Sequence, residues 1–423
     1  MKLTGALAGQ PAMHFHQLSF EGPDAYARAG GLASRVVGLG RQLAALGHET
    51  HLWFVGDPAL PDHDCVGLVH LHRWCQWISA YHPRGVYDGE FGKALDYAES
   101  LPPHLLELIL PAVRSGTPVT VLAEEWHTVG AVLHLDDLLR RRGIRDAVRL
   151  LWNANNTFGF EHIDFTQLAR AATITTVSRY MKHTMRSLGI DPLVIPNGLE
   201  PAAFAPLRPV WVRAFAAHLS PRLLLAKVAR FDPDKRWIAA IDIVAALRQR
   251  GARPLLVARG GIEPHGREVR ERARFHGLRI AQRASEPGAL GLIAALDDVD
   301  DIDVLLLTAP LGPEARRLLF RAAAAVLANS GHEPFGLVGL EAMAAAGVAC
   351  TGISGEDYAI SGHNAIVLQT SAPEEAVVNI ERLRARPSEE HALRRRGLAT
   401  ARRFAWRSVI THNLVPQIEL CGT

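Results

Sequence analysis

The sequence predicts an α/β protein with two doubly wound domains, each a parallel sheet covered by helices. The first sign is an extended segment over 13–20 that leads into Gly30 and Gly31. Apolar residues then recur at steps of three and four, as on one face of a helix: Leu32, Val36, Leu39, Leu43 and Leu46. Gly47 ends this helix, and 50–55 reads as a strand. This βαβ unit implies a parallel sheet.

The same alternation continues along the chain and is interrupted once. Further strands are expected at 118–122, 149–152, 173–177, 193–195, 223–229, 254–257, 304–307, 325–327 and 348–350, and a further helix at 237–248. Between 196 and 221, five prolines break any long periodic segment. We therefore predict an N-terminal Rossmann-like domain over 1–200, a linker over 201–221, a C-terminal Rossmann-like domain over 222–405 and a closing helix over 406–423. A ligand is expected in the cleft between the domains, at the strand ends.

Composition excludes several classes of protein. The chain has 423 residues, of which 48% are apolar, so it can bury a large core and is not disordered. A net charge of +3 is too small for a broad nucleic-acid-binding surface. The cysteines have no CxxC spacing, which argues against a zinc ribbon or a disulfide framework: Cys65, Cys75, Cys350 and Cys421. With no long apolar run and no leader-like start, a cytoplasmic protein is expected.

The most informative stretch, 329–343, leaves a strand, passes a proline and a glycine, and opens a helix. Backbone amides around Phe335, Gly336 and Leu337 would be free at this helix start, where an anion such as a diphosphate is stabilised. Glu333 before the helix and Glu341 inside it can accept hydrogen bonds from different hydroxyls of one ligand. The pattern indicates a nucleotide-sugar site.

This stretch resembles the E-x7-E signature of the large, family 4-like group of retaining GT-B glycosyltransferases, which includes sucrose synthases and phosphatidylinositol mannosyltransferases. A second landmark over 228–235 is similar to that family's strand-to-helix turn and carries Arg230 and Lys235. The resemblance implies the GT-B fold. It also implies that both cations hold the diphosphate of the donor and stabilise it as it leaves.

Two elements of the first half are similar to those of glycogen and starch synthases. Arg28 to Leu32 resembles their K-x-G-G-L element, in which Gly30 and Gly31 would let the backbone approach a phosphate. Glu125, Trp126 and His127 match their D-W-H-T, with Glu in place of Asp. These resemblances imply a glucosyl-type donor.

One departure from the family concerns a histidine that usually follows the next strand, where this chain has asparagines. Asn155 or a neighbour such as Asn153 takes that place, or His127 takes over its role. An asparagine can bind a sugar hydroxyl but cannot exchange a proton near neutral pH. We group His127 with the catalytic candidates Arg230, Lys235 and Glu333, with a purely structural His127 as the alternative. The acceptor-side candidates are Arg28, Glu125, Trp126, Asn153 and Asn155.

The function expected from these residues is a metal-independent, retaining transfer of a hexose from a nucleotide-diphosphate sugar to an acceptor hydroxyl, such as that of a carbohydrate. No cofactor other than this donor substrate is expected, and the oligomeric state is open. An α-glucan synthase, a nucleotide-sugar epimerase or phosphorylase, and a non-catalytic sugar-binding module are the alternatives.

Three further patterns are expected to have no functional role. The acidic run over 297–303 has the D-x-D spacing of metal-dependent transferases but is expected to be a solvated loop. His70 and His72 alternate like metal ligands, yet no third ligand is evident along the sequence. Arg140 to Arg142 is expected to be a solvated helix face rather than a contact with an anionic membrane.

Overall fold

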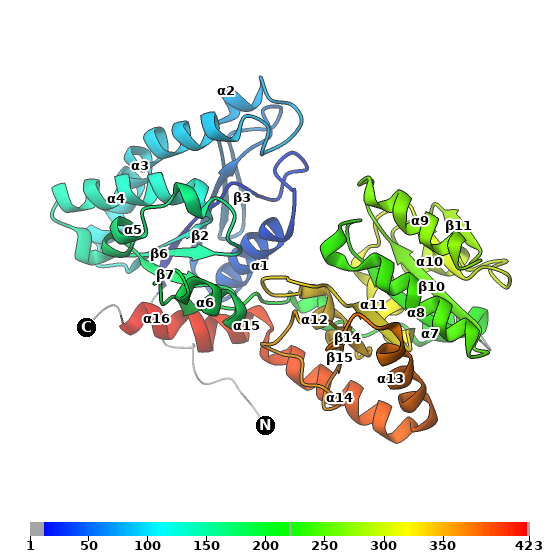
Figure 1. Ribbon diagram of the computed structural model, residues 1–423. Helices are drawn as coiled ribbons and strands as arrows, with labels where there is room; N and C mark the ends of the chain where they lie inside the picture. The colour runs from blue at the N-terminus through cyan, green and yellow to red at the C-terminus, as the bar shows by residue number, and fades with distance from the viewer. Residues whose placement is uncertain (1–11, 220–221, 421–423) are drawn as a thin grey trace. The chain divides into compact units, whose positions relative to one another are not determined.

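A computed structural model describes residues 12–219 and 222–420 (Figure 1). The described residues form two compact domains. The N-terminal domain runs to Gly198 and also includes the segment from Ala405 onward, whereas the C-terminal domain is Leu199–Phe404. Cys421, considered above, lies outside the described residues.

The N-terminal domain contains an eight-stranded sheet in the order β3-β4-β2-β1-β5-β6-β7-β8, in which only the β3–β4 pair is antiparallel. The strands are β1 His14–Leu18, β2 Glu49–Val55, β3 His63–Val66, β4 Val69–Trp74, β5 Val119–Glu124, β6 Val148–Ala154, β7 Thr173–Thr176 and β8 Leu193–Val194. From β1 the chain moves outward through β2 to β4 and then returns to β5 on the other side of β1. This reversal at β1 and β5 is a topological switch point, where open α/β sheets bind ligands.

The helices of this domain cover both faces of the sheet. They are α1 Gly31–Ala45, α2 Gln76–Ser79, α3 Glu90–Arg114, α4 Val129–Arg141, α5 Phe165–Ala171 and α6 Arg179–Arg186. Helix α1 buries Leu32, Val36, Leu39 and Leu43, which confirms the helix predicted from their spacing. Gly47 follows the helix with a φ of +93°, a conformation that glycine adopts without strain.

The C-terminal domain repeats this plan with an all-parallel sheet in the order β11-β12-β10-β9-β13-β14-β15. The strands are β9 Leu223–Val228, β10 Pro254–Arg259, β11 Ile280–Arg283, β12 Val304–Leu307, β13 Ala325–Ala328, β14 Ala349–Thr351 and β15 Ile366–Val367. Here the chain reverses direction between β9 and β13, so the switch point of this domain lies between these two strands.

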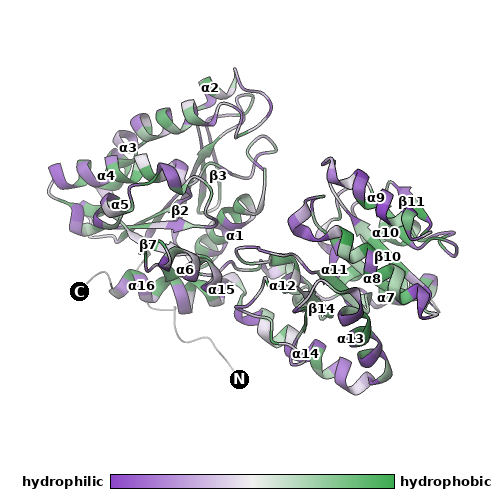
Figure 2. Ribbon diagram, in the orientation of Figure 1, coloured by the Kyte–Doolittle hydropathy of each residue, from purple (hydrophilic) through white to green (hydrophobic). Residues whose placement is uncertain are grey.

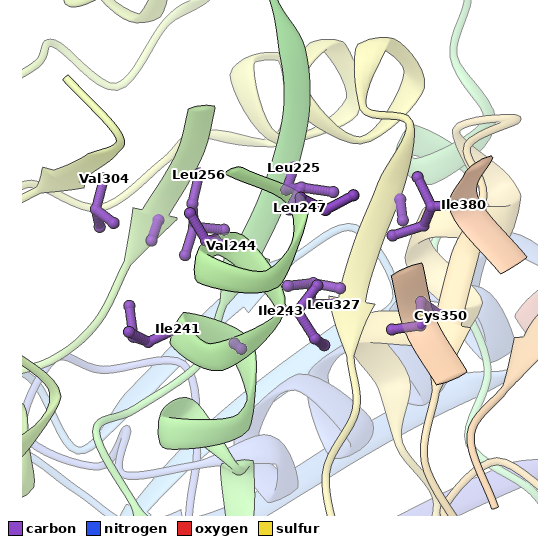
Figure 3. Close-up of a cluster of buried hydrophobic side chains, with 14 of the residues drawn as sticks. Leu225, Ile241, Ile243, Val244, Leu247, Leu256, Val304, Leu327, Cys350 and Ile380 are labelled. Carbon is purple, nitrogen blue, oxygen red and sulfur yellow. The ribbon is translucent and has the colours of Figure 1, made fainter. Parts of the chain in front are cut away.

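Helices pack on this second sheet through a continuous apolar core. They are α7 Pro209–Leu219, α8 Trp237–Gln249, α9 His265–Phe275, α10 Ala289–Ala294, α11 Pro313–Ala322, α12 Leu337–Ala344, α13 Pro373–Ala385 and α14 Pro387–Arg403. Figure 3 shows Val244 of α8 next to Leu256 of β10 and Leu247 of α8 next to Leu225 of β9, and all four belong to one buried cluster. Hydrophobic residues are concentrated in the strands, and α9 and α14 carry many hydrophilic ones (Figure 2).

The predicted linker is more ordered than its prolines suggested. The described part of 201–221 contains a short 3-10 turn, Pro201–Phe204, and helix α7, whereas 220–221 lie outside the described residues. Prolines interrupt a helix in its interior but are tolerated in its first turn, and Pro209 is the first residue of α7. Phe215 and Leu219 of α7 are buried, so this helix belongs to the C-terminal domain.

The closing segment packs into the core of the N-terminal domain as α15 Trp406–Val409, a π-helical turn Ile410–Leu414 and α16 Val415–Leu420. Trp406 is 1% exposed and lies in a cluster with Phe15 and Leu39. Two glycines make room for its indole. A Cβ at Gly38 would lie 2.4 Å from the indole Nε1, and one at Gly198 would lie 2.4 Å from Cδ2. The sequence around Trp406 is therefore matched to glycines far away in the chain.

Two further features concern membrane-spanning helices and the cysteines. Among the described residues, no helix combines the length and the apolar character that a membrane crossing requires. The described cysteines are free thiols, with Cys65 exposed and Cys75 and Cys350 buried.

The fit between Gly38 and Trp406 gives a prediction about stability. Replacing an exposed helical glycine by alanine usually stabilises a protein by about 0.5–1 kcal/mol. Gly38→Ala should instead destabilise the N-terminal domain by about 1–3 kcal/mol, because the new methyl group meets the indole. In a Trp406→Ala background the same change should be neutral or stabilising. Denaturant unfolding of the four proteins measures this reversal.

Gly92 of α3 is the matched control, because a Cβ there would meet nothing within 4 Å. Gly92→Ala should be neutral or stabilising in both backgrounds. An equal effect of Gly38→Ala with and without Trp406 would contradict the packing described above.

Candidate functional site

Two turns lie side by side at the switch point of the C-terminal sheet. Strands β9 and β13 are paired, with Leu225 opposite Ala325, and each is followed by a turn at its carboxyl end. The turn after β9 carries Arg230 and Lys235 and ends in a 3-10 turn, Pro233–Lys235. The amide of Gly331, which follows β13, donates to the carbonyl of Asp234 at 2.8 Å. The two turns are therefore joined through their backbones.

A buried lysine holds the strands beneath these turns. Lys227 of β9 is 1% exposed, and its Nζ donates to the carbonyl of Leu327 at 3.0 Å and to Oδ1 of Asn329 at 2.7 Å. The side-chain Nδ2 of Asn329 in turn donates to the carbonyl of Arg236 at 3.4 Å. Burial lowers the pKa of Lys227 to about 7. Sequence reasoning missed this role, although a lysine inside an otherwise apolar strand was a signal for it.

Two of the four catalytic candidates named from the sequence, Lys235 and Glu333, form an ion pair. Each side chain is 20% exposed, so the pair is recessed but reachable from solvent. Burial and the nearby charge of Arg230 lower the pKa of Lys235. Arg230 is exposed. The turns thus present two cations beside one carboxylate.

Helix α12 begins directly after Glu333 and Phe335. Its N-terminal neighbour Gly336 has a φ of +80°, and no described side chain caps the helix start. The hydroxyl of Tyr358 donates to the carbonyl of Gly336 and so fixes the approach to the helix. The first amides of a helix are hydrogen-bond donors without intrahelical partners, so this end of α12 favours an anion.

Glu341 lies one turn into α12 and pairs with Arg316, not with Lys235. Its Oε1 is 3.2 Å from Nη1 of Arg316 in α11. Partial removal from water raises the pKa of Glu341, and the Arg316 charge opposes that shift. Phe335 and Leu337 flank the helix start, and Phe335 packs against Tyr358 with ring centroids 5.8 Å apart. The donor-side candidates of this domain therefore gather at the carboxyl ends of β9 and β13.

In the N-terminal domain, the glycine turn before α1 is already occupied by a carboxylate. Oε2 of the buried Glu21 accepts from the amides of Gly30 at 2.9 Å and Ala33 at 3.1 Å. Its Oε1 accepts from the hydroxyl of Tyr87 at 2.8 Å. The Gly30 amide is therefore engaged by Glu21, and binding of a phosphate by the amides near Gly31 stays a prediction. A Cβ at Gly31 would meet nothing within 4 Å, so that side of the turn is open.

The asparagines that replace the family's histidine meet a buried acid at the end of β5. Glu124 accepts from Nε of Arg35 at 2.9 Å through Oε1. Through Oε2 it accepts from the side-chain amides of Asn153 at 2.8 Å and Asn155 at 2.7 Å. Both oxygens of this carboxylate therefore have donors, and the network fixes both asparagines. Sequence reasoning named the asparagines but not Glu124 or Arg35.

Glu125 combines an unusual backbone conformation with a shifted pKa. Its φ of +69° and ψ of 168° lie in a region that residues other than glycine rarely adopt. Glu125 is 5% exposed. Burial raises the pKa of its carboxyl to about 8, although hydrogen bonds from Asn155 oppose the shift. Backbone strain and a shifted pKa at one residue are typical of functional sites.

His127 and Trp126 form part of an aromatic stack beside Glu125. The ring of His127 stacks on Phe20 and on Trp126, with centroids 4.1 Å away in each case. Its Nε2 lies 3.3 Å from Oε2 of Glu90. Burial lowers the pKa of His127 to about 3, so it does not accept a proton near neutral pH. Its catalytic role stays a prediction, limited to hydrogen bonding.

The structure also shows the contacts of Arg28 and of the acidic run over 297–303. Arg28 is exposed, and its Nη2 donates to the carbonyl of Pro23 at 2.8 Å. In the acidic run over 297–303, Asp297 pairs with His218 and Asp301 with Arg279, while Asp303 accepts from the Arg279 amide. Each of these three acids therefore has a partner within the protein.

Glu125 gives a prediction about pH. Its folded-state pKa of about 8 lies above the usual 4.5, so ionisation is disfavoured in the folded protein. The free energy of unfolding should therefore fall as pH rises from about 4.5 to about 8, by on the order of 1–5 kcal/mol relative to Glu125→Gln, which cannot ionise. Denaturant unfolding of both proteins at a series of pH values measures this difference.

The exposed Glu161 offers the control, since Glu161→Gln should leave the pH dependence unchanged. A constant difference in stability between the wild type and Glu125→Gln across this pH range would contradict the buried, protonated carboxyl.

Comparison with known proteins agrees with this architecture. The model of Glycosyltransferase Family 4 matches residues 29–203, most of the N-terminal domain. No curated protein matches the chain by sequence. Among solved structures, sucrose-phosphate synthase from Thermosynechococcus elongatus is 18% identical with a TM-score of 0.64, covering 97% of this chain and 100% of that one.

Two further structures are similar over nearly their whole length. The catalytic domain of starch synthase IV from Arabidopsis thaliana, bound to ADP and acarbose, is 14% identical with a TM-score of 0.68, covering 98% of this chain and 100% of that one. A UDP-forming trehalose-phosphate synthase from Burkholderia xenovorans, in complex with glucose-6-phosphate, is 15% identical with a TM-score of 0.63, covering 97% and 100%. The chain therefore has the GT-B fold of these structures, and over residues 29–203 it is similar to Glycosyltransferase Family 4.

Proposed function

We propose that the protein is a retaining glycosyltransferase that moves a hexose, of the glucosyl type, from a nucleotide-diphosphate sugar to an acceptor hydroxyl without a metal ion. The observation that carries this proposal is the position of Arg230, Lys235 and Glu333 on two turns joined at the ends of β9 and β13. A diphosphate carries two or more negative charges, and two cations beside an uncapped helix start can balance them.

The ion pair between Lys235 and Glu333 suits a site in which Lys235 leaves Glu333 when a diphosphate binds. Lys235 is held by a carboxylate and lies near the positive Arg230, so an arriving diphosphate offers it a stronger anion. Glu333 would then be released to accept hydrogen bonds from the sugar hydroxyls. Glu341 would bind the ribose, with Arg316 setting its position. The amides that open α12 at Gly336 and Leu337 would bind phosphate oxygens.

The mechanism that follows is stabilisation of a leaving group. As the bond from the sugar to the diphosphate breaks, negative charge grows on the phosphate oxygens, and Lys235 and Arg230 stabilise that charge. The two acidic candidates are assigned to hydroxyl groups, so attack by the acceptor from the face that the diphosphate leaves explains retention without a covalent intermediate. Catalysis then comes from charge stabilisation and from positioning of the acceptor.

The N-terminal domain would supply the acceptor side. Glu125 is protonated below about pH 8 and can therefore both donate and accept hydrogen bonds with a sugar hydroxyl. Asn153 and Asn155 are fixed by Glu124, and the flat ring of Trp126 offers an apolar surface on which a sugar ring can stack. The starch synthase structure holds ADP and acarbose, and the trehalose-phosphate synthase is UDP-forming. Both support a nucleotide sugar as the donor and leave its base open.

The donor can be identified by thermal denaturation in the presence of UDP, GDP, ADP and their sugars. A ligand that binds the folded state raises its melting temperature. One nucleoside diphosphate should give a larger shift than the other two, and Arg230→Ala should reduce that shift. Stabilisation by none of the diphosphates would contradict a nucleotide-sugar site.

With the donor known, Lys235 gives a prediction about rate. Lys235→Ala should lower kcat by roughly 10²-fold or more, because it removes one group that stabilises the developing charge. Release of nucleoside diphosphate in the presence of an acceptor measures kcat. Lys182→Ala is a matched control. Lys182 lies on helix α6 and pairs with the exposed Asp191, so its replacement should not affect turnover.

The same assay separates the alternatives. A transferase releases nucleoside diphosphate in proportion to the glycoside formed, whereas an epimerase yields neither product. A sugar-binding module without turnover would bind the donor and release nothing, and Glu333→Ala would then have no rate to abolish. Unchanged turnover in Lys235→Ala would contradict the role given to this residue.

A further inference from the structure

Histidines gather on one face of the N-terminal sheet, on strands that are far apart in the sequence. His14 of β1 lies opposite Glu49 of β2 in the parallel register, and His51 of β2 lies opposite His70 of β4. Alternate residues of a strand point to the same face. The imidazoles of these strands and the Glu49 carboxylate therefore share that face, and pairing of the strands supplies the ligands that the sequence did not reveal.

Three imidazoles direct the same nitrogen at one carboxylate. Nε2 of His14 is 3.3 Å from Oε2 of Glu49, and Nε2 of His51 is 3.3 Å from its Oε1. Nε2 of His70 is 3.9 Å from the same Oε1. The ligand atoms of Glu49, His51 and His70 all lie within 4.8 Å of one another. Ligands around a tetrahedral Zn²⁺ with bonds of 2.0–2.1 Å lie about 3.3 Å apart, so small movements suffice.

The second nitrogen of two of these rings already has a partner. Nδ1 of His51 lies 3.0 Å from Nε2 of His72, and Nδ1 of His70 lies 3.4 Å from Nε2 of His63. A histidine that binds a metal through Nε2 carries its hydrogen on Nδ1 and donates it to such an acceptor. The contacts around His51 and His70 have this arrangement.

One neighbour is excluded from the ligand set by the same reasoning. His16 also lies within reach of His14 and His51. Its Nδ1 accepts from the indole of Trp53 at 3.4 Å, which places its hydrogen on Nε2 and leaves no lone pair there. His16 instead stacks on His51, with ring centroids 4.6 Å apart, and supports that ring.

We propose that His14, Glu49, His51 and His70 bind one divalent transition-metal ion of the Zn²⁺ class and so clamp β1, β2 and β4 together. Imidazoles with a carboxylate are a ligand set typical of Zn²⁺. The His14, Glu49 and His70 side chains are 26%, 39% and 25% exposed, so an ion can enter from solvent, whereas His51 is 9% exposed and anchors the site.

The proposed ion lies away from the groups assigned to sugar transfer in this domain. His14 and Glu49 are the first residues of β1 and β2, whereas Glu125 follows the carboxyl end of β5. About 13 Å of strand separates the two ends of β1. The ion is therefore a structural one, and the metal-independent transfer proposed above is unaffected by it.

Titration of the full-length chain, without a polyhistidine tag and after treatment with a chelator, tests the proposal. Calorimetry with Zn²⁺ should give one ion per chain, and Zn²⁺ but not Mg²⁺ should raise the melting temperature. Co²⁺ should give the visible absorption of a tetrahedral or five-coordinate site. Absence of Zn²⁺ binding, or an equal response to Mg²⁺, would overturn the proposal.

Variants assign the ligands. Glu49→Gln, His51→Gln and His70→Gln should each weaken Zn²⁺ binding at least about 10-fold, whereas His183→Gln, at an exposed histidine of α6, should leave it unchanged. Circular dichroism of the metal-free proteins checks folding, and the partly exposed Glu49 and His70 carry the test if His51→Gln does not fold. Binding that survives all three changes, or a thiolate-to-cobalt absorption from the nearby Cys65, would refute this ligand set.

Discussion

The buried amine of Lys227 is the constraint on which the C-terminal site depends. Removing an ammonium group from water is costly, and here the cost is offset by two acceptors supplied by β13 and the turn after it, Leu327 and Asn329. The contact fixes the ends of β9 and β13 relative to each other. Arg230, Lys235 and Glu333 are carried on the turns beyond these ends, so their spacing is set by a group that itself never reaches solvent.

The N-terminal domain shows a different way of holding charged groups inside a protein. Glu21 is satisfied by helix amides and a tyrosine hydroxyl, and Glu124 by an arginine and two asparagines. Glu125 has fewer donors, and its pKa is raised accordingly. These three buried acids thus differ in the number of donors that they have. The strained backbone of Glu125 is held by its amide, which donates to the carbonyl of Asn153 at 3.0 Å, and by its carbonyl, which accepts from the indole of Trp152 at 2.9 Å.

Local patterns in the sequence predicted the local elements, and the resemblance implied the overall fold. The 3.6-residue period located α1, and the E-x7-E stretch located the start of α12. Contacts between residues that are far apart in the sequence could not be predicted from these local patterns. His51 meets His70 only because β2 pairs with β4 in one register, and Glu21 reaches the start of α1 only after the chain turns back. The helix within the predicted linker was missed because its proline lies at the first position, where the usual rule against proline does not apply.

The chain enters the C-terminal domain at Leu199 and leaves it at Phe404, and these two residues lie next to each other in space. The amide of Leu199 donates to the carbonyl of Phe404 at 2.7 Å, so the C-terminal domain begins and ends at a single backbone hydrogen bond. In topological terms it is an insertion within the N-terminal domain, which resumes at Ala405 and is completed by Trp406. Adjacent ends are what make an inserted domain separable. The C-terminal domain is thus one contiguous segment, and a short peptide from Gly198 to Ala405 could close the chain of the N-terminal domain without it.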